Sequence, residues 1–389
     1  MTAPLAPGVY REFFATAPRP AFRTGVPAFL GLATAGPTAE PVELAGWAEF
    51  ERVFGARPEG GFLAPAVHGF FRAGGALCTV VRLADGGAAS LARGLAALEA
   101  AEGVDLVCVP DAMGRPRAEA VRRQQAVLRH CERVGGRFAI LDSVPGDAPA
   151  GVLAQRRELA REGDAPGWAA LRNAALYHPW LVVEGWDGPV PPCGHVAGVY
   201  AVSDARVGVH KPPANERLDG VLDLAALLDD AANGALNAGG INCIRAFPGR
   251  GVRVWGARAL SGADAAPPEE AAWKYVSVRR TVLTLGRWID AALAGMAFEP
   301  ADPGLWARIV REVGGYLDAA FRRGALQGRT AGDAYFVRCD AALNPPEVRA
   351  AGMVVVEVGL APAVPNEFIV VRFARGADDP DTPGPTGPA

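Results

Sequence analysis

Two aspartates follow predicted buried strands, at positions where an enzyme could carry catalytic carboxylates. Asp111 comes shortly after the apolar run Val104–Val109, and Asp142 directly follows Arg137–Leu141. In open α/β sheets, ligands bind at the carboxyl ends of the strands. Aspartates at strand ends also begin turns and cap helices, so the catalytic and the structural interpretations are both open here.

Histidine and cysteine side chains are the other candidates for chemistry, as metal ligands. His130, His178 and His195 could act together with Cys131 or Cys193. Cys193 and His195 are two residues apart, but no second pair has ligand spacing, and a structural zinc site needs four ligands. We therefore expect neither a metal ion nor a cofactor.

A glycine-rich segment after Phe247 could be a phosphate loop. It contains Gly249 and Gly251 in a Gly-x-Gly pattern, but the third glycine, Gly256, is misplaced. A strand follows, whereas a dinucleotide site needs the N-terminus of a helix. The segment therefore predicts a turn between two strands. The chain contains neither a P-loop motif nor the Gly-x-Ser-x-Gly motif of hydrolases.

Composition excludes several classes of protein. The chain has 389 residues, of which 50% are hydrophobic and 21% charged, and its formal net charge is −3. No apolar run is long enough to span a bilayer, so we expect no membrane insertion. The basic domain typical of nucleic-acid binding is missing, and the N-terminus does not resemble a signal peptide. The six cysteines lie far apart in apolar runs, which predicts buried free thiols in a reducing compartment.

The order of the elements predicts an α/β fold with a mainly parallel sheet, because strands and helices alternate. The predicted strands of the first half cover residues 28–32, 78–82, 104–109 and 137–141. Helices are predicted at 47–54, 64–71 and 91–101, and a long one ends at Gly135. Residues 142–220 have a weaker pattern.

The second half predicts an α+β domain. A helix over 222–236 precedes strands at 241–244 and 252–255, and a long helical segment covers 267–295. Asp302 and Pro303 are typical of the N-cap and first position of the next helix. Strands follow at 335–339 and 353–359. We divide the chain into an N-terminal arm (1–24), an α/β body (25–247), a C-terminal domain (248–365), and a C-terminal arm with a low-complexity tail (366–389).

Both termini contain a short strand-like run, separated from the rest by prolines. A lone strand leaves its N–H and C=O groups unpaired, so it must join a sheet, either in its own subunit or in a neighbouring one. Both possibilities are open from the residues alone. The two runs are Val9, Tyr10, Arg11, Glu12 and Phe13, and Glu367, Phe368, Ile369, Val370, Val371, Arg372 and Phe373.

Many co-linear blocks between residues 7 and 373 resemble the tail sheath proteins of contractile phage tails and contractile injection systems. These blocks are Pro7–Tyr10, Gly25–Gly31, Phe138–Asp142, Ala175–Trp180, Gly194–Tyr200, Lys211–Asn215, Gly251–Ser261, Trp273–Arg280, Phe298–Pro300 with Leu305–Trp306, Gly324–Gly328 and Gly359–Phe368. The chain departs from the pattern in Ala259, where relatives commonly have threonine before Leu-Ser.

The resemblance implies a non-enzymatic structural subunit. Such subunits form stacked hexameric rings around an inner tube, and the sheath contracts when the baseplate triggers it, driving the tube through a target envelope. The implied partners are other copies of the chain, the inner tube protein, the baseplate and a tail terminator or cap protein. Assembly would take place in the bacterial cytoplasm, with release on lysis.

The resemblance also assigns roles to parts of the chain. It implies that both terminal arms add strands to neighbouring subunits and that the C-terminal domain meets the tube. We predict that four charged residues of the helix after Asp302 face the tube: Arg308, Arg311, Glu312 and Arg322. Two other functions remain as alternatives, a cytosolic α/β enzyme or nucleotide-binding protein that uses Asp111 and Asp142, and a non-contracting tail or baseplate adaptor.

Overall fold

A computed structural model describes residues 23–55, 61–160 and 167–365. The two predicted arm strands and the low-complexity tail lie outside these residues. Eight strands form one sheet in the order β10-β9-β6-β5-β4-β1-β3-β2. Only the edge strands β2 and β10 run antiparallel to their neighbours, so the predicted α/β fold with a mainly parallel sheet is confirmed. The strands are β1 (Pro27–Gly31), β2 (Pro41–Leu44), β3 (Cys78–Arg82), β4 (Leu106–Cys108), β5 (Phe138–Asp142), β6 (Ala174–His178), β9 (Ile241–Phe247) and β10 (Gly251–Trp255).

Helices cover both faces of this sheet, which explains why its strands are continuous apolar runs. In β1, Phe29 packs into the core on one face, while Ala28 and Leu30 pack into the core on the other. The first face carries α1 (Trp47–Phe54), α2 (Leu63–Arg72) and α7 (Cys193–Arg206). The second carries α3 (Ala88–Leu98), α4 (Arg117–Val134), α5 (Pro149–Leu159), α6 (Trp168–Leu171) and α8 (Asp230–Ala238).

Two glycines allow α7 and α2 to approach closely. A Cβ atom at Gly194 would lie 2.0 Å from the carbonyl oxygen of Ala66, and one at Gly198 would lie 2.7 Å from that of Phe70. The sequence did not predict α7, because most of its residues are buried and it has no polar stripe from which a helical period could be read.

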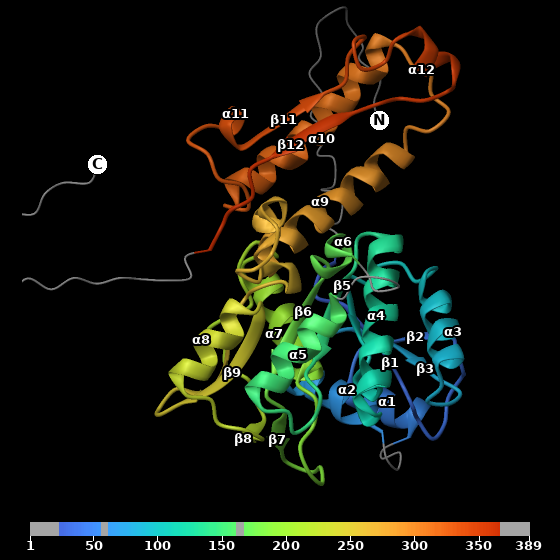
Figure 1. Ribbon diagram of the computed structural model, residues 1–389. Coiled ribbons are helices and arrows are strands. Elements are labelled where there is room, and N and C mark those ends of the chain that lie inside the picture. Colours follow the sequence, from blue (N-terminus) through green and yellow to red (C-terminus); the bar gives the residue numbers. More distant parts are fainter. Residues whose placement is uncertain (1–22, 56–60, 161–166, 366–389) are drawn as a thin grey trace, which may run out of the picture.

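A separate unit of helices and a hairpin rises from one end of the sheet body (Figure 1). Its elements are α9 (Val276–Ala294), α10 (Pro303–Arg322), α11 (Ala331–Ala334), β11 (Tyr335–Arg338), α12 (Pro346–Ala350) and β12 (Glu357–Leu360). They enclose a third apolar core, to which α9 contributes from Leu285 onward. Asp302 caps α10 as predicted, since its Oδ1 accepts a hydrogen bond from the Leu305 amide at 2.8 Å.

The third core begins later in the chain than the predicted boundary at residue 248. That position lies in the turn between β9 and β10, which pair in the main sheet. The chain reaches the C-terminal unit along α9, about 30 residues after the predicted boundary. The expected helical segment 267–295 is divided into a short 3-10 helix over Pro268–Trp273 and α9.

The predicted helix over 222–236 is wrong in its first half. Val221–Leu224 is a strand, β8, which pairs antiparallel with β7 (Leu181–Val183). Helix α8 begins after Asp229, whose side chain accepts a hydrogen bond from the Ala232 amide at 2.7 Å. Pairing with a distant strand therefore overrides the local pattern.

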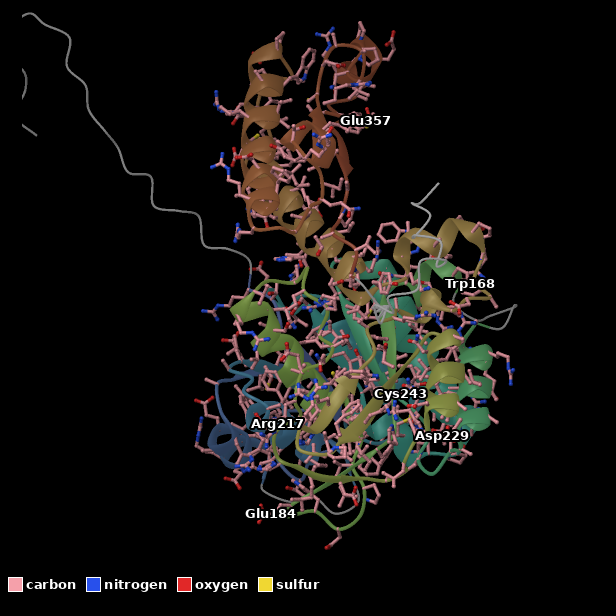
Figure 2. The ribbon with its side chains drawn as sticks, turned by 90° about the vertical axis from the view of Figure 1, so that its left-hand side faces the viewer. Trp168, Glu184, Arg217, Asp229, Cys243 and Glu357 are labelled. Carbon is pink, nitrogen blue, oxygen red and sulfur yellow. The ribbon has the colours of Figure 1, made fainter. Side chains whose placement is uncertain are left out.

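Glu184, next to β7, and Glu357 of β12 lie at opposite ends of the molecule (Figure 2).

Strand β12 is shorter than the predicted strand 353–359, since pairing with β11 begins at Glu357. Before it, the Val355 backbone bonds to the Asn344 side chain, which donates to the Val355 carbonyl at 3.0 Å and accepts from its amide at 2.7 Å. Within the described residues, no helix has the length and apolar character needed to cross a bilayer.

Candidate functional site

Asp111 is a structural residue that joins two loops. It lies in a short 3-10 helix after β4 and is only 6% exposed. Its carboxylate accepts hydrogen bonds from the backbone amides of Leu32, at 2.6 Å, and Phe62. Burial raises its pKa, although these two hydrogen bonds act in the opposite direction. Backbone amides donate to both carboxylate oxygens, so Asp111 joins two loops. This agrees with the structural interpretation of the residue and not with the catalytic one.

Asp142 has the same kind of role at the end of β5. It is 2% exposed, and its Oδ1 accepts a hydrogen bond from the Cys193 amide at the start of α7, at 2.8 Å. Burial raises its pKa to about 7, against the lowering effect of the bonds from Cys193. The structure places Asp111 and Asp142 at neighbouring strand ends but gives each its own backbone partners.

The three candidate metal-binding histidines lie apart and are buried. His178 Nδ1 lies 2.9 Å from the Ser143 hydroxyl, and His130 Nε2 lies 2.8 Å from Nη1 of Arg137. Burial lowers the pKa of His130, His178 and His195 to about 4, which favours neutral imidazoles. Within the described part of the chain, no group of three or more histidine, cysteine or acidic residues could hold a metal ion. All six cysteines are buried and unpaired.

The glycine-rich segment is the turn between β9 and β10, as predicted. Gly249 and Gly251 have φ values of +69° and +73°, which favour glycine. Arg253 Nη1 donates to the Asn215 carbonyl at 2.7 Å, and Arg250 Nη2 donates to the Asn215 side chain at 2.9 Å. This hairpin therefore has no helix N-terminus with which to hold a phosphate.

A buried charge cluster that the sequence analysis missed lies where α9 leaves the sheet body. Arg280 of α9 is 2% exposed, and its guanidinium bonds to both oxygens of Asp204 in α7, at 2.9 and 2.5 Å. The same guanidinium donates to Asp105 at 2.9 Å and stacks on the Tyr200 ring at 4.8 Å. Burial opposes its charge, but Asp204 and Asp105 outweigh that effect and raise its pKa.

A sequence signal for this cluster existed. Arg280 lies four residues after Val276, on the helix face that Val276 marks as buried. An arginine on a buried helix face needs a carboxylate partner. The sequence could not identify Asp105 and Asp204 as the partners, because they lie 175 and 76 residues away.

The charged side chains predicted to face the tube lie on α10, whose buried face contains Leu305, Ile309, Val313 and Leu317. Arg308 pairs with Glu299, and Arg322 pairs with Asp318 at 2.6 Å. Arg311 is exposed, and Glu312 is partly buried. The structure therefore places all four residues on one helix, with two of the arginines already bonded to acidic residues.

The β11–β12 hairpin is a two-stranded sheet that packs on α10. Tyr335 and Val337 are partly buried and pack against the third core, whereas Phe336 is 51% exposed on the outer face. The Phe336 ring covers Gly359, where a Cβ atom would lie 2.1 Å from a ring carbon. Within the described residues, each strand has one edge with no partner strand. Such edges can accept a further strand.

Comparisons with known proteins agree with this architecture. Residues 86–260 match the sequence model of the phage tail sheath protein central domain. A chain in the cryo-EM structure of the anti-feeding prophage (AFP) baseplate, 6-fold symmetrised, is 29% identical; the match covers 96% of this chain and 99% of that chain, with a TM-score of 0.76. No curated protein sequence matches the chain.

Two further similar structures are of sheaths in the contracted state. A chain of the AFP helical sheath is 29% identical over 95% of this chain and 99% of its own length, with a TM-score of 0.75. A chain of the PVC sheath complex, from an extracellular contractile injection system, is 26% identical over 97% and 99%, with a TM-score of 0.73. These similarities indicate a structural, non-enzymatic protein, in agreement with the structural roles of Asp111 and Asp142.

Proposed function

We propose that the chain polymerises as stacked hexameric rings around an inner tube. Two similarities support this proposal: residues 86–260 match the sequence model of the phage tail sheath central domain, and 95–97% of the chain matches chains of contractile injection systems. Contraction of this sheath, triggered by the baseplate, drives the tube through a target envelope. The observation that carries the proposal is the match to AFP and PVC sheath chains in the contracted state, over 95% and 97% of this chain.

Strand exchange between subunits holds the rings together in this proposal. The arms Val9–Phe13 and Glu367–Phe373 add to the sheet of a neighbouring copy, with β11 and β12 as the acceptor. Three features of the hairpin support this choice: its edges have no partner strand among the described residues, α10 covers its inner face, and it lies in the unit that projects from the body. Main-chain hydrogen bonds then link the copies.

Such links suit a sheath that must change its shape without coming apart. Short strand ladders persist while the tethers before and after them reorient, and the rigid bodies move as units. Prolines at 18, 20 and 365 favour extended tethers over helices, whereas Pro362 forms an antiparallel bridge with Leu326 inside the C-terminal unit. Because the donor and acceptor surfaces differ, the contact is heterologous. Such contacts form rings where the rotation closes and a helical array where it does not.

The remaining partners follow from the same proposal. The C-terminal unit faces the inner tube through the charged face of α10, with Arg308, Arg311, Glu312 and Arg322 as the contact residues. The ends of the sheath meet the baseplate and a tail terminator or cap protein. The particle assembles in the bacterial cytoplasm and leaves on lysis, as part of a phage tail or a related extracellular device.

Electron microscopy of the purified chain and two truncations tests this function. We expect rings or tubes from the full chain. Variants that lack residues 1–15 or 367–389 should give folded monomers that do not polymerise, because each has lost one donor strand. Normal tubes from either truncation would reject strand exchange at that end. A full chain that stays monomeric, and melts higher with a nucleotide, would favour the enzyme alternative.

A position next to the baseplate is the second candidate. The observation behind it is the similarity to a chain in the AFP baseplate structure, whose 29% identity equals that of the AFP helical sheath chain. A bulk sheath protein forms long tubes by itself, whereas a baseplate-proximal one forms single rings or needs the baseplate. The length of the assemblies in the micrographs therefore separates the two positions.

A further inference from the structure

Helix α9 connects the sheet body to the C-terminal unit without a break. Val276 packs into a core of the body, Arg280 bonds to Asp105 and Asp204 of the body, and Leu285 and Trp288 belong to the third core. At 1.5 Å per residue, its 19 residues span about 28 Å. The orientation of the C-terminal unit therefore depends on how firmly the first turns of α9 are held.

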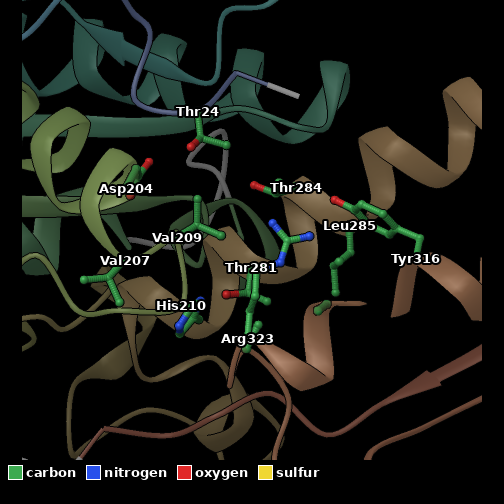
Figure 3. A pocket seen from close by; sticks show the side chains of 13 residues that line it. Thr24, Asp204, Val207, Val209, His210, Thr281, Thr284, Leu285, Tyr316 and Arg323 are labelled. Atoms are coloured by element: carbon green, nitrogen blue, oxygen red, sulfur yellow. The ribbon is translucent and has the colours of Figure 1, made fainter. Parts of the chain in front are cut away.

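A pocket separates the two units beside α9. It has a volume of about 190 Å³ and lies between the body residues Thr24, Asp204 and His210 and the C-terminal residues Tyr316 and Arg323 (Figure 3). Because the two units leave a gap here, their packing against each other contributes less to the orientation at this point. The orientation of the C-terminal unit relative to the body therefore depends more strongly on how the first turns of α9 are held.

The carboxylates that hold Arg280 also hold the segment at which the N-terminal arm joins the body. Asp105 Oδ1 accepts from the Val26 amide at 2.7 Å, and its Oδ2 accepts from the Gly25 amide at 3.1 Å. The Thr24 side chain hydrogen-bonds to Asp204. We call residues 24–26 the arm root. Arg280 is therefore linked to the arm root through two carboxylates, those of Asp105 and Asp204.

Close packing fixes the arm root in place as well. Gly25 has a φ of +73°, and a Cβ atom there would lie 2.5 Å from the Cα of Ala201 in α7. The backbone of the root is therefore pressed onto the helix that carries Asp204. A residue with a side chain could not occupy this position without moving α7 or the root.

We infer that Arg280 is a positioning residue for assembly, which holds the arm root and the C-terminal unit in one fixed relation. This inference rests on the proposed function, in which the arm donates a strand and the C-terminal unit accepts one. Two copies can link repeatedly only if, in every copy, the arm starts from the same place relative to the acceptor, because the tether between the arm root and the donor strand has a limited reach. One guanidinium, bonded to Asp105 and Asp204, sets that geometry at the point where both parts leave the body.

Hydrogen exchange and small-angle X-ray scattering on the unassembled full-length chain test the inference. Arg280→Met removes the guanidinium, and Arg280→Lys keeps a charge that can reach one carboxylate. Arg123→Met is the matched control, because Arg123 is also a buried arginine on a helix, 3% exposed and paired with Glu119, but makes its ion pair within α4. Electron microscopy then follows tube formation by the same variants.

We expect Arg280→Met to speed exchange of the Gly25 and Val26 amides about tenfold or more, since their acceptor Asp105 loses the guanidinium that holds it in place. Its scattering profile should broaden as the C-terminal unit samples more orientations, and tubes should be lost. Arg280→Lys should have smaller effects than Arg280→Met on exchange, scattering and tube formation. Arg123→Met should leave exchange at the arm root and the scattering profile as in the wild type. Wild-type exchange and scattering in folded Arg280→Met would overturn the inference.

Should Arg280→Met fail to fold, Asp105→Asn takes its place. Its amide group would stand where an oxygen now accepts from Gly25 and Arg280. Exchange of the arm-root amides should therefore become faster and the scattering profile broader, as expected for Arg280→Met. Wild-type values for both would again overturn the inference. If the wild-type chain itself forms neither rings nor tubes, the proposed function fails, while the exchange and scattering results still decide whether Arg280 couples the two parts.

Discussion

At the scale of single residues, buried polar side chains of this chain hold its backbone in place. Asp111 and Asp142 occupy strand ends, where an enzyme would place a catalytic carboxylate. Here they accept hydrogen bonds from the amides of Leu32, Phe62 and Cys193. An unpaired amide in the interior costs about as much as a lost hydrogen bond, so these carboxylates stabilise the loops that they join.

Asp142 should make the stability of the protein depend on pH. Its pKa is about 7 in the folded chain and about 3.9 in an unfolded one, so between these values the folded state binds more protons. The free energy of unfolding therefore falls as pH rises through this window, by up to about 1.4 kcal/mol per pH unit from this group. We expect Asp142→Asn to remove this part of the slope, as measured by urea unfolding at a series of pH values.

The exposed aspartate Asp187 provides the control for this measurement. Asp187→Asn should leave the pH dependence of unfolding as it is in the wild type. If Asp142→Asn and the wild type have parallel curves between pH 4 and 7, Asp142 does not titrate in the folded chain as its burial predicts.

At the scale of elements, the sequence predicted best where local signals and packing agree. Trp47–Phe54 is α1 with the predicted bounds, and α10 begins after Asp302 as its cap residues indicate. The prediction failed where a distant partner decides. Val221–Leu224 is a strand because β7 pairs with it, and α7 had no readable period because it is buried.

The contact between α7 and α2 should be sensitive to a single methyl group. A Cβ atom at Gly194 would lie 2.0 Å from a backbone oxygen of α2, so Gly194→Ala must push the two helices apart. We expect a loss of about 1–3 kcal/mol in the free energy of unfolding, measured by denaturant titration.

The control is a glycine with open space around it. A Cβ atom at Gly234 of α8 would have no neighbour within 4 Å, so Gly234→Ala should stabilise the protein by about 0.5–1 kcal/mol through helix propensity. Equal effects of the two substitutions would show that helix propensity, and not the close approach of α7 to α2, decides both.

The β11–β12 hairpin should tolerate a charge on its outer face as a monomer but not in the assembly. Phe336 is 51% exposed and covers Gly359, so Phe336→Glu should cost about 1 kcal/mol or less in stability. A charge on an edge strand opposes the addition of another strand. Electron microscopy should show no tubes from Phe336→Glu but normal tubes from Phe336→Tyr, and tubes from both would argue against the hairpin as acceptor.

At the scale of the whole molecule, the sequence predicted the class of fold and its resemblance to sheaths but not how the parts are joined. Within residues 23–365, apart from the two short undescribed gaps, three cores form one sheet body and one projecting unit, and the chain passes between them along α9. The junction depends on Arg280 and on Asp105, which lies 175 residues away. No local pattern contains such a pairing, because folding alone brings the two residues together.

Contact between the sheath and the inner tube should depend on the charged face of α10. Arg308 and Arg322 already pair with acidic residues of their own chain, so the exposed Arg311 is the sharper site for a charge reversal. We expect Arg311→Glu to fold normally but to lose most of the tube protein that co-purifies with the sheath. Arg122→Glu, on an exposed position of α4 in the body, should retain it.

Since exposed charges are screened by salt, raising the ionic strength should also reduce the amount of tube protein that co-purifies with the wild-type sheath. Full co-purification with Arg311→Glu, at low and at high salt, would place the tube contact on another part of the C-terminal unit.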